Sequence, residues 1–270
     1  MIRLIATDLD GTLLNQRSEV SERTARIVAD VMTAGAKFVL ASGRMFQSTR
    51  PFAQSLRLNA PILVFNGAMV CDWQTGTPQF SIDIGASTAR SVCAMAEARG
   101  LFIQYFPERG FFYQRRVAEV CDEYEARIRF YGEETHVPLS QWIQRPAMKL
   151  LCLGEHERLL ELRAEILREH PDLSVMLSHP TYLEIVAGGV DKGRALARLC
   201  AALGVEREDV AAFGDAGNDL AMLQFAKYGY AMANADEGLL ARIERHAPAN
   251  DDDGVARTLE QMLLRGMIGG

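Results

Sequence analysis

The chain has 270 residues, of which 49% are hydrophobic and 24% are charged. This is the composition of an ordinary globular protein with enough apolar material for a full core. The formal net charge of −6 at pH 7 argues against binding to nucleic acid or to an anionic membrane surface as the role of the whole chain. At roughly 150 residues per domain, the length predicts one large domain or two modest ones.

No stretch of the sequence has the pattern of a membrane span or a signal peptide. The longest uncharged run, Leu58 to Cys71, has 14 residues, whereas a spanning helix needs roughly 20 mostly apolar residues. The apolar segment from Leu4 to Thr7 is too short for the hydrophobic region of a signal peptide. The 5 cysteines are widely spaced without a CxxC pair, which argues against a disulfide framework or a zinc site. We therefore expect a cytoplasmic protein with reduced thiols.

Strand and helix signals alternate through the first 83 residues. Apolar runs that end at polar turns predict buried strands at residues 2–7, 37–41 and 61–65. Between them, one helix is predicted to begin after a Ser21 cap and to stop at Gly35, and a second at residues 45–56. The pair Asn66-Gly67 is typical of a hairpin turn. Strand–helix–strand order with short loops predicts a parallel, doubly wound sheet.

The pattern changes near Asp83 and returns after Gly188-Gly189. In between, the sequence predicts a separate α+β module, with strands at 101–106, 110–114, 147–153, 173–177 and 182–186 and helices at 86–99, 117–130 and 155–169. The first pattern then resumes, with helices at 192–203, 219–225, 237–243 and 255–264 and strands at 209–213 and 228–232. We therefore predict an α/β core with a doubly wound, Rossmann-like parallel sheet, formed by residues 1–83 plus 186–270, and an inserted α+β domain at residues 84–185.

Polar residues follow the predicted core strands. The first strand is followed by Asp8, Leu9 and Asp10, the second by Ser42-Gly43-Arg44, and a later strand by the run from Gly214 to Asp219. Lys192 opens the helix after the inserted module. Because ligands bind at the carboxyl ends of strands in open α/β sheets, we expect these groups to share one site.

Carboxylates are the most numerous of these polar groups. Carboxylates a few ångströms apart repel each other and raise each other's pKa, so the cluster is costly without a cation. An oxygen-only cluster with no suitable His or Cys indicates a hard ion, above all Mg²⁺, whose coordination is completed by waters and substrate phosphate. Of Asp8 and Asp10, one can act as a nucleophile and the other can transfer protons. Suitable donors to phosphate oxygens are Ser42, the Gly43 N–H, Lys192 and Asn218.

Each motif taken alone has a common alternative. An Asp-x-Asp pattern also occurs in turns and in the metal sites of nucleotide-sugar transferases, and a lysine that opens a helix is usually solvated. The run from Gly214 to Asp219 is more specific, because two Asp, an Asn and two Gly in six residues are poorly suited to a core. The agreement of all four motifs, each at a strand end or a helix start, carries the prediction.

The four motifs resemble those of the haloacid dehalogenase superfamily of phosphohydrolases, and within it the Cof-like subgroup with a type-2 α/β cap. DLDGTLL begins at Asp8, ASGR ends at Arg44, DKG begins at Asp191 and GDAGNDLAML begins at Gly214. The tail NDDDGVA, which begins at Asn250, also fits the subgroup. The resemblance extends over the whole chain, with no departure at a motif position. It implies that residues 84–185 form the cap, which closes over the site and selects the substrate.

The resemblance also implies a role for each motif residue. Asp8 is the nucleophile that forms an aspartyl-phosphate, and Asp10 protonates the leaving alcohol and then deprotonates the attacking water. Mg²⁺ is bound by the carboxylates of Asp8 and Asp215 and by the backbone carbonyl of Asp10. Phosphate is held by Ser42, Lys192 and Asn218 together with the backbone amides of Leu9 and Gly43.

Three further residues are expected to support the site. Asp219 supports either the metal or Lys192, and Thr12 is expected to hydrogen-bond within its own turn. Arg44 either reaches toward the cap or the substrate or pairs with a local acid. We expect the Asn66-Gly67 turn to shape the rim of the site without taking part in the chemistry.

These expectations combine into a Mg²⁺-dependent phosphatase of small phosphorylated metabolites, with no nucleic-acid or membrane partner. Sugar phosphates are the first expectation, and nucleotide or cofactor phosphates are further ones. One alternative is a phosphomutase, which shares the aspartyl-phosphate step but returns the phosphoryl group to a second hydroxyl. Another is a phospho-accepting regulatory module without turnover, which the length of the chain disfavours.

Overall fold

The computed structural model describes residues 1–269, which form two compact units. The first comprises Met1–Gly43, Thr49–Phe80 and the chain from Asp191 onward, and the second comprises Arg44–Ser48 and Ser81–Val190. The first unit contains a parallel sheet and the second a mainly antiparallel one. The predicted α/β fold class is confirmed, while the predicted domain boundaries remain a prediction.

The sheet of the first unit has five parallel strands in the order β14-β13-β12-β1-β2. Their bounds are Arg245–Ala247, Tyr228–Met232, Val210–Gly214, Leu4–Thr7 and Lys37–Leu40, in that order. Strand β1 pairs on one side with β12 and on the other with β2, with Leu4 opposite Val210 and Lys37. The strand order therefore reverses between β1 and β12, and an open α/β sheet binds its ligand at such a point.

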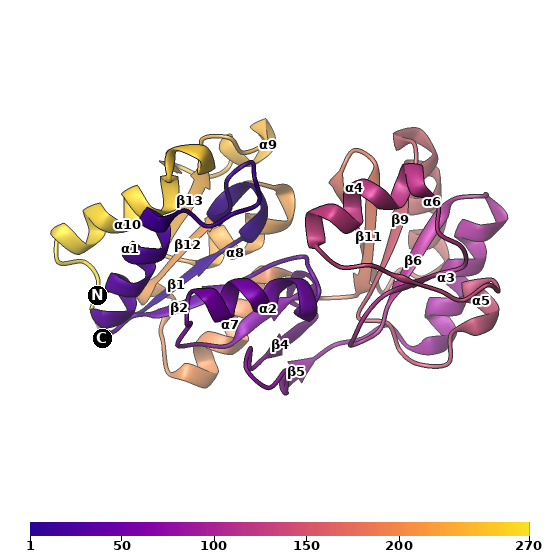
Figure 1. The fold of residues 1–270 in the computed structure, drawn as a ribbon, viewed down its shortest axis with the longest axis horizontal. Coiled ribbons are helices and arrows are strands. Elements are labelled where there is room, and N and C mark those ends of the chain that lie inside the picture. Colours follow the sequence, from indigo (N-terminus) through magenta and orange to yellow (C-terminus); the bar gives the residue numbers. More distant parts are fainter. Residues whose placement is uncertain (270) are drawn as a thin grey trace. The chain divides into compact units, whose positions relative to one another are not determined.

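Helices flank this sheet (Figure 1). Helix α1 (Glu22–Thr33) packs against α10 (Gly254–Leu264), and α7 (Lys192–Leu203) packs against α8 (Leu220–Phe225). All four residues of β1 are buried, as expected for a strand covered on both faces. Ser21 caps α1 by accepting a hydrogen bond from the Thr24 N–H, as the sequence predicts. The shorter elements are α2 (Phe46–Ser55), α9 (Glu237–Leu240), and the irregular turns η1 (Leu9–Leu13), η3 (Arg207–Asp209), η4 (Gly217–Asp219) and η5 (Asn250–Asp252).

The third predicted strand does not extend the parallel sheet. It forms β3 (Ile62–Val64), the first strand of a separate three-stranded sheet with β4 (Met69–Cys71) and β5 (Pro78–Ser81). The turn η2 (Phe65–Gly67) joins β3 to the antiparallel strand β4, so the predicted hairpin at Asn66-Gly67 is confirmed. A single parallel bridge between Ala41 and Leu63 connects the end of β2 to β3.

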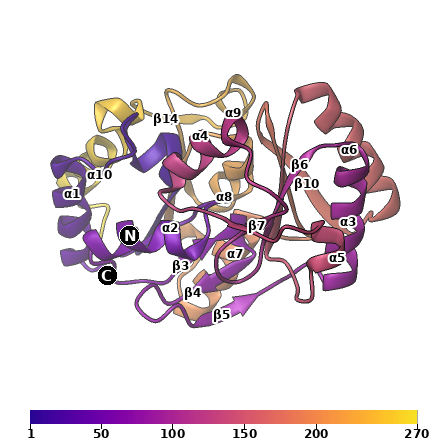
Figure 2. The ribbon, with the colours of Figure 1, turned by 45° about the vertical axis from the view of Figure 1, so that its right-hand side comes forward.

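The second unit is built on a six-stranded sheet in the order β10-β11-β9-β6-β7-β8. The strands span Leu173–His179, Tyr182–Ala187, Lys149–Leu153, Phe102–Phe106, Phe112–Tyr113 and Glu133–Glu134. Helix α3 (Ala86–Ala98) packs against β6 and α6 (His156–Glu169) against β10, and Figure 2 shows these two helices side by side. The remaining helices are α4 (Ala118–Ile128) and α5 (Leu139–Trp142). The short elements β8 and α5 were not predicted, since two to four residues carry too little periodicity.

No helix in the described part of the chain has the length and apolarity that crossing a bilayer requires.

A glycine at the start of α7 allows that helix to approach α8 closely. A Cβ added at Gly193 would lie 2.4 Å from the carbonyl oxygen of Ala221. We therefore predict that Gly193→Ala destabilises the protein by about 1–3 kcal/mol, which lowers the unfolding midpoint by roughly 3–10 °C. Gly85→Ala is the matched control, because a Cβ there meets no atom within 4 Å. An unchanged midpoint for Gly193→Ala in a thermal denaturation experiment would contradict this account of the packing.

Candidate active site

The site is centred on Asp8, the residue that directly follows β1. Its backbone N–H donates to the Phe213 carbonyl oxygen at 3.0 Å, so the sheet pairing with β12 continues through this residue. Only 7% of Asp8 is exposed. The parallel pairing of β1 with β12 also places Gly214 and Asp215 beside it, although they lie more than 200 positions further along the chain.

The turn after Asp8 fits closely against Asp215. Gly11 has a φ of +74°, and a Cβ there would lie 2.3 Å from Asp215 Oδ2, so both conformation and space require glycine. The Thr12 hydroxyl donates to Asp215 Oδ1 at 2.6 Å. The expectation that Thr12 bonds within its own turn was therefore wrong. The tertiary partner is preferred because it gives a buried hydroxyl a charged acceptor.

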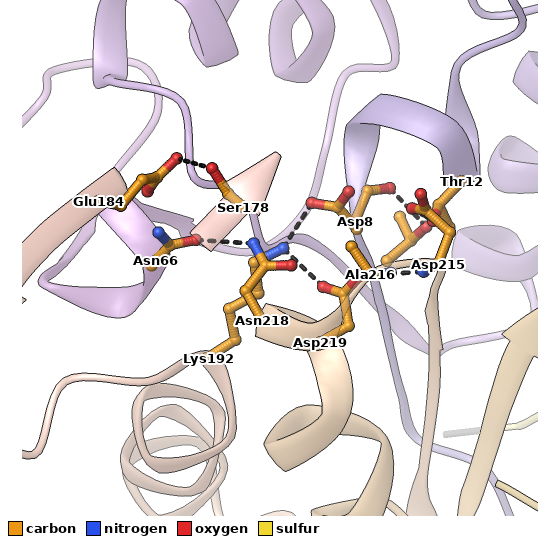
Figure 3. Close-up of polar contacts among 11 residues, drawn as sticks. Asp8, Thr12, Asn66, Ser178, Glu184, Lys192, Asp215, Ala216, Asn218 and Asp219 are labelled. Carbon is orange, nitrogen blue, oxygen red and sulfur yellow. Dashed lines mark hydrogen bonds and ion pairs between the residues drawn. The ribbon is translucent and has the colours of Figure 1, made fainter. Parts of the chain in front are cut away.

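Lys192 is fully buried, in contrast to the usual solvated lysine at the start of a helix. Asp191 caps α7 by accepting from the Arg194 N–H, and the Lys192 side chain then extends into the site. Its Nζ donates to Asp8 Oδ1 and to Asp219 Oδ1, each at 2.6 Å (Figure 3). A cation at a helix N-terminus is disfavoured by the helix dipole, so the two carboxylates are what stabilise it here.

Asp219 is held rigidly by the turn that precedes α8. Its Oδ2 accepts the backbone N–H groups of Asp215 at 3.0 Å and Ala216 at 3.1 Å, while Oδ1 accepts from Lys192. No part of Asp219 is exposed. Of the two predicted partners for this residue, the geometry therefore places Lys192 in direct contact.

Burial and mutual repulsion change the protonation of this cluster. Burial raises the pKa of Asp8 well above its ordinary value, and the neighbouring carboxylates add to this, although Lys192 opposes it. Burial and the charge of Asp219 raise the pKa of Asp215 to about 7, against the lowering effect of the Thr12 hydroxyl. Burial alone lowers the pKa of Lys192, but Asp219 and Asp8 more than reverse this, so the ammonium stays charged.

The residues present fit a hard divalent cation. Asp8, Asp215 and Asp219 each offer a carboxylate oxygen, and these oxygens lie within 4.8 Å of one another. The charge of Asp10 contributes to the raised pKa of both Asp8 and Asp215, so this residue belongs to the same electrostatic cluster. An oxygen-only set with excess negative charge suits Mg²⁺. The sequence prediction named Asp10, through its backbone carbonyl, as the third ligand, and did not name Asp219 as one.

The predicted phosphate-binding residues lie on loops that are bonded to one another. The Ser42 N–H donates to the Leu63 carbonyl at 2.9 Å, and the Ser42 carbonyl accepts from the Asn66 N–H at 3.0 Å. Asn218 Nδ2 donates to Asn66 Oδ1 at 3.0 Å. Sequence reasoning expected the Asn66-Gly67 turn only to shape the rim of the site, and it did not predict the bond between Asn66 and Asn218. Leu9 is fully buried next to Asp8.

Arg44 follows Gly43 directly and is 4% exposed. It belongs to the segment Arg44–Ser48, which is grouped with the second unit. Its side chain is therefore buried and is not a solvated surface arginine.

Comparisons with known proteins agree with this geometry. A profile of the haloacid dehalogenase-like hydrolase family matches residues 5–259. A putative phosphatase of Haemophilus influenzae is 29% identical over 97% of this chain and 98% of its own length. The 5-amino-6-(5-phospho-D-ribitylamino)uracil phosphatase YitU of Bacillus subtilis is 26% identical over 96% of both chains.

A solved structure extends the agreement to the fold. The crystal structure of a haloacid dehalogenase-like hydrolase from Bacteroides thetaiotaomicron superimposes with a TM-score of 0.89 at 30% identity, covering 97% of this chain and 100% of that one. The resemblance inferred from the four motifs is thereby confirmed. The chain belongs to the haloacid dehalogenase-like hydrolase family and is a phosphatase of that superfamily.

Proposed function

We propose that this phosphatase is Mg²⁺-dependent and hydrolyses small phosphorylated metabolites through a phosphoryl group carried on Asp8. The observation that carries the proposal is the buried ammonium of Lys192, held at 2.6 Å from both Asp8 and Asp219. Carboxylate oxygens of these two residues and of Asp215 lie within 4.8 Å of one another. A cation beside a buried carboxylate at a sheet switch point is suited to phosphoryl transfer, which depends mainly on positioning and on neutralising charge.

Asp8 and Asp215 would hold Mg²⁺ with their carboxylates, and Asp10 with its backbone carbonyl. When bound, the ion neutralises phosphate oxygens and lowers the repulsion between carboxylates. Burial and the charge of Asp219 raise the pKa of Asp215 to about 7, and a bound cation would favour the ionised form of this carboxylate.

Asp8 is the proposed nucleophile. One carboxylate oxygen forms a bond to phosphorus while the bond from phosphorus to the leaving oxygen breaks, and Asp10 gives its proton to that oxygen. Asp10, now ionised, takes a proton from water, and the water oxygen attacks phosphorus. The bond between Asp8 and phosphorus then breaks, which releases inorganic phosphate and restores both carboxyl groups. Lys192 favours the ionised form of the free nucleophile before the first step, since its charge lowers the pKa of Asp8.

The transferred phosphoryl group is proposed to be held by donors from four segments of the chain: the turn after β1, the loop after β2, the start of α7 and the turn before α8. These donors are Ser42, the amides of Leu9 and Gly43, Lys192 and Asn218. Lys192 uses two of its three N–H groups on Asp8 and Asp219, which leaves a third for a phosphate oxygen. Arg44 is proposed to support the substrate end of the site.

Small phosphorylated metabolites are the proposed substrates, with sugar phosphates first and nucleotide or cofactor phosphates next. The name of a relative at 26% identity, YitU of Bacillus subtilis, describes it as a phosphatase of a phosphorylated ribitylamino uracil. This supports small phosphorylated metabolites as the substrate class. Residues 84–185 are proposed to be the domain that determines specificity, and a cytoplasmic location remains a prediction.

Asp8→Asn should abolish Mg²⁺-dependent release of phosphate from p-nitrophenyl phosphate, because an amide is a poor nucleophile. The measurement is the initial rate with and without Mg²⁺. Asp30→Asn is the matched control, since Asp30 is an exposed residue of α1. Retained activity in Asp8→Asn would reject the nucleophile, and turnover of wild type without free phosphate would indicate a phosphomutase.

Asp10→Ala should lower kcat by about 10²–10⁴-fold, the range typical of lost general acid–base catalysis. Asp8 remains able to react, so intact-mass spectrometry after rapid quenching should detect phosphorylated protein when a substrate with a good leaving group is used. A variant as fast as wild type would show that another group moves the proton.

The stability of the metal-free protein should fall as pH rises from about 4 to about 7. The folded state then retains protons on Asp8 and Asp215 that the unfolded state has lost, because both folded pKa values are raised. Mg²⁺ requires ionised carboxylates, so it should raise the unfolding midpoint more at pH 8 than at pH 5. Thermal unfolding in EDTA and in millimolar Mg²⁺ tests this. Asp215→Asn should weaken both effects, and equal effects of Mg²⁺ at both pH values would contradict the assignment.

A further inference from the structure

Three consecutive residues after β3 have left-handed backbone conformations. Their φ angles are +53° at Phe65, +58° at Asn66 and +91° at Gly67. Glycine adopts this region freely and asparagine tolerates it, but it is rare for a bulky aromatic residue. Such strain persists only where the surroundings hold it in place, and it is concentrated at functional sites.

Asn66 connects the turn to the loop that carries Ser42 and Gly43. Its backbone N–H donates to the Ser42 carbonyl at 3.0 Å. Asn66 is 1% exposed, and a Cβ added at Gly43 would lie 2.9 Å from Asn66 Oδ1. The backbone at Gly43 therefore lies directly against the Asn66 side-chain amide, so that neither group can move toward the other.

The same amide oxygen fixes the orientation of Asn218, which lies 152 positions away in the sequence. Asn66 Oδ1 accepts a hydrogen bond from Asn218 Nδ2 at 3.0 Å (Figure 3). A primary amide has two N–H groups, so this bond occupies one and leaves the other for a ligand. Asn218 Oδ1 is buried without a hydrogen-bond partner in the described part of the chain. The bond to Asn66 thus holds the Asn218 amide by its Nδ2 nitrogen and sets the orientation of the amide group.

Gly67 connects the turn to the start of α7. A Cβ added at Gly67 would lie 2.7 Å from the Ala195 Cβ and 2.8 Å from the Asp191 carbonyl oxygen. The turn η2 is therefore packed against the helix that begins with Lys192. One three-residue turn touches the segments that carry all three side chains proposed to hold phosphate: Ser42, Lys192 and Asn218.

We infer that Asn66 is a positioning residue for the phosphate group of the substrate. Its amide oxygen accepts a hydrogen bond from one N–H of Asn218, so that the other N–H is available to a phosphate oxygen. Its backbone N–H donates to the Ser42 carbonyl and so holds the Ser42-Gly43 loop next to Asn218. This inference rests on the proposed function and deepens it. The expectation that this turn shapes the rim of the site without taking part in the chemistry is thereby extended to an indirect part in phosphate binding, through Asn218 and the Ser42-Gly43 loop.

Asn66→Gly tests the side chain without disturbing the backbone, because glycine adopts a φ of +58° without strain. We expect kcat/KM for p-nitrophenyl phosphate to fall by about tenfold to a hundredfold, the range expected for one hydrogen bond to a charged group. The inhibition constant of inorganic phosphate should rise by a similar factor. Arg57→Gly is the matched control, since Arg57 is exposed and has a φ of +51° outside the site.

A double-mutant cycle with Asn218→Ala separates positioning from a general structural role. If Asn66 acts through Asn218, the variant with both substitutions should bind inorganic phosphate about as weakly as Asn218→Ala alone. Wild-type values of kcat/KM and of the phosphate inhibition constant in Asn66→Gly would overturn the inference. Fully additive losses in the cycle would also overturn it, because they would show that the two residues act independently.

The failure of this inference is distinguishable from the failure of the proposed function. A wild-type protein that releases no phosphate in the presence of Mg²⁺ would reject the proposed function. Titration calorimetry with inorganic phosphate would then still compare wild type with Asn66→Gly. Weaker binding in the variant supports the inference, and equal binding overturns it.

Discussion

The site depends on one buried ionic interaction, the ammonium of Lys192 between the carboxylates of Asp8 and Asp219. Lys192 and Asp219 are fully buried and Asp8 is 7% exposed, and a charge buried without a partner costs several kcal/mol. The two bonds of 2.6 Å and the two backbone N–H groups that Asp219 accepts compensate that cost. The same arrangement leaves Asp8 ionisable in an environment that by itself favours the neutral acid.

The topology of the parallel sheet is what brings these groups together. β1 and β12 are neighbours in the sheet, and the direction of the strand order reverses between them. Their carboxyl ends therefore present Asp8 and Asp215 at one edge, while the start of α7 contributes Lys192 and the turn before α8 contributes Asp219. Negative charge accumulates there beyond what Lys192 neutralises, which is the electrostatic basis for proposing a divalent cation.

Close packing around glycine sets the spacing of the surrounding loops. Gly11 allows its turn to lie against Asp215, Gly67 allows η2 to lie against α7, and Gly193 allows α7 to lie against α8. A Cβ at any of these positions would come within 3 Å of another atom. The loops of the site are therefore held in place by close packing of the glycine backbone against neighbouring side chains and carbonyl groups. A site organised in this way is preorganised for a small, highly charged group and requires little rearrangement to bind it.

The amino-acid sequence by itself determined the kinds of element and the residues at the strand ends. Apolar periodicity located β1, β2, β12 and β13, and the motifs that begin at Asp8 and Gly214 identified the family. Only the tertiary structure showed that β3 belongs to a separate sheet and does not extend the parallel one. Likewise, only the tertiary structure showed the hydrogen bonds from Thr12 to Asp215 and from Asn218 to Asn66. Local patterns report which face of an element is buried and where a chain turns. A hydrogen bond between residues 152 or 203 positions apart depends on how packed elements orient two side chains, and that orientation is decided only when the core has formed.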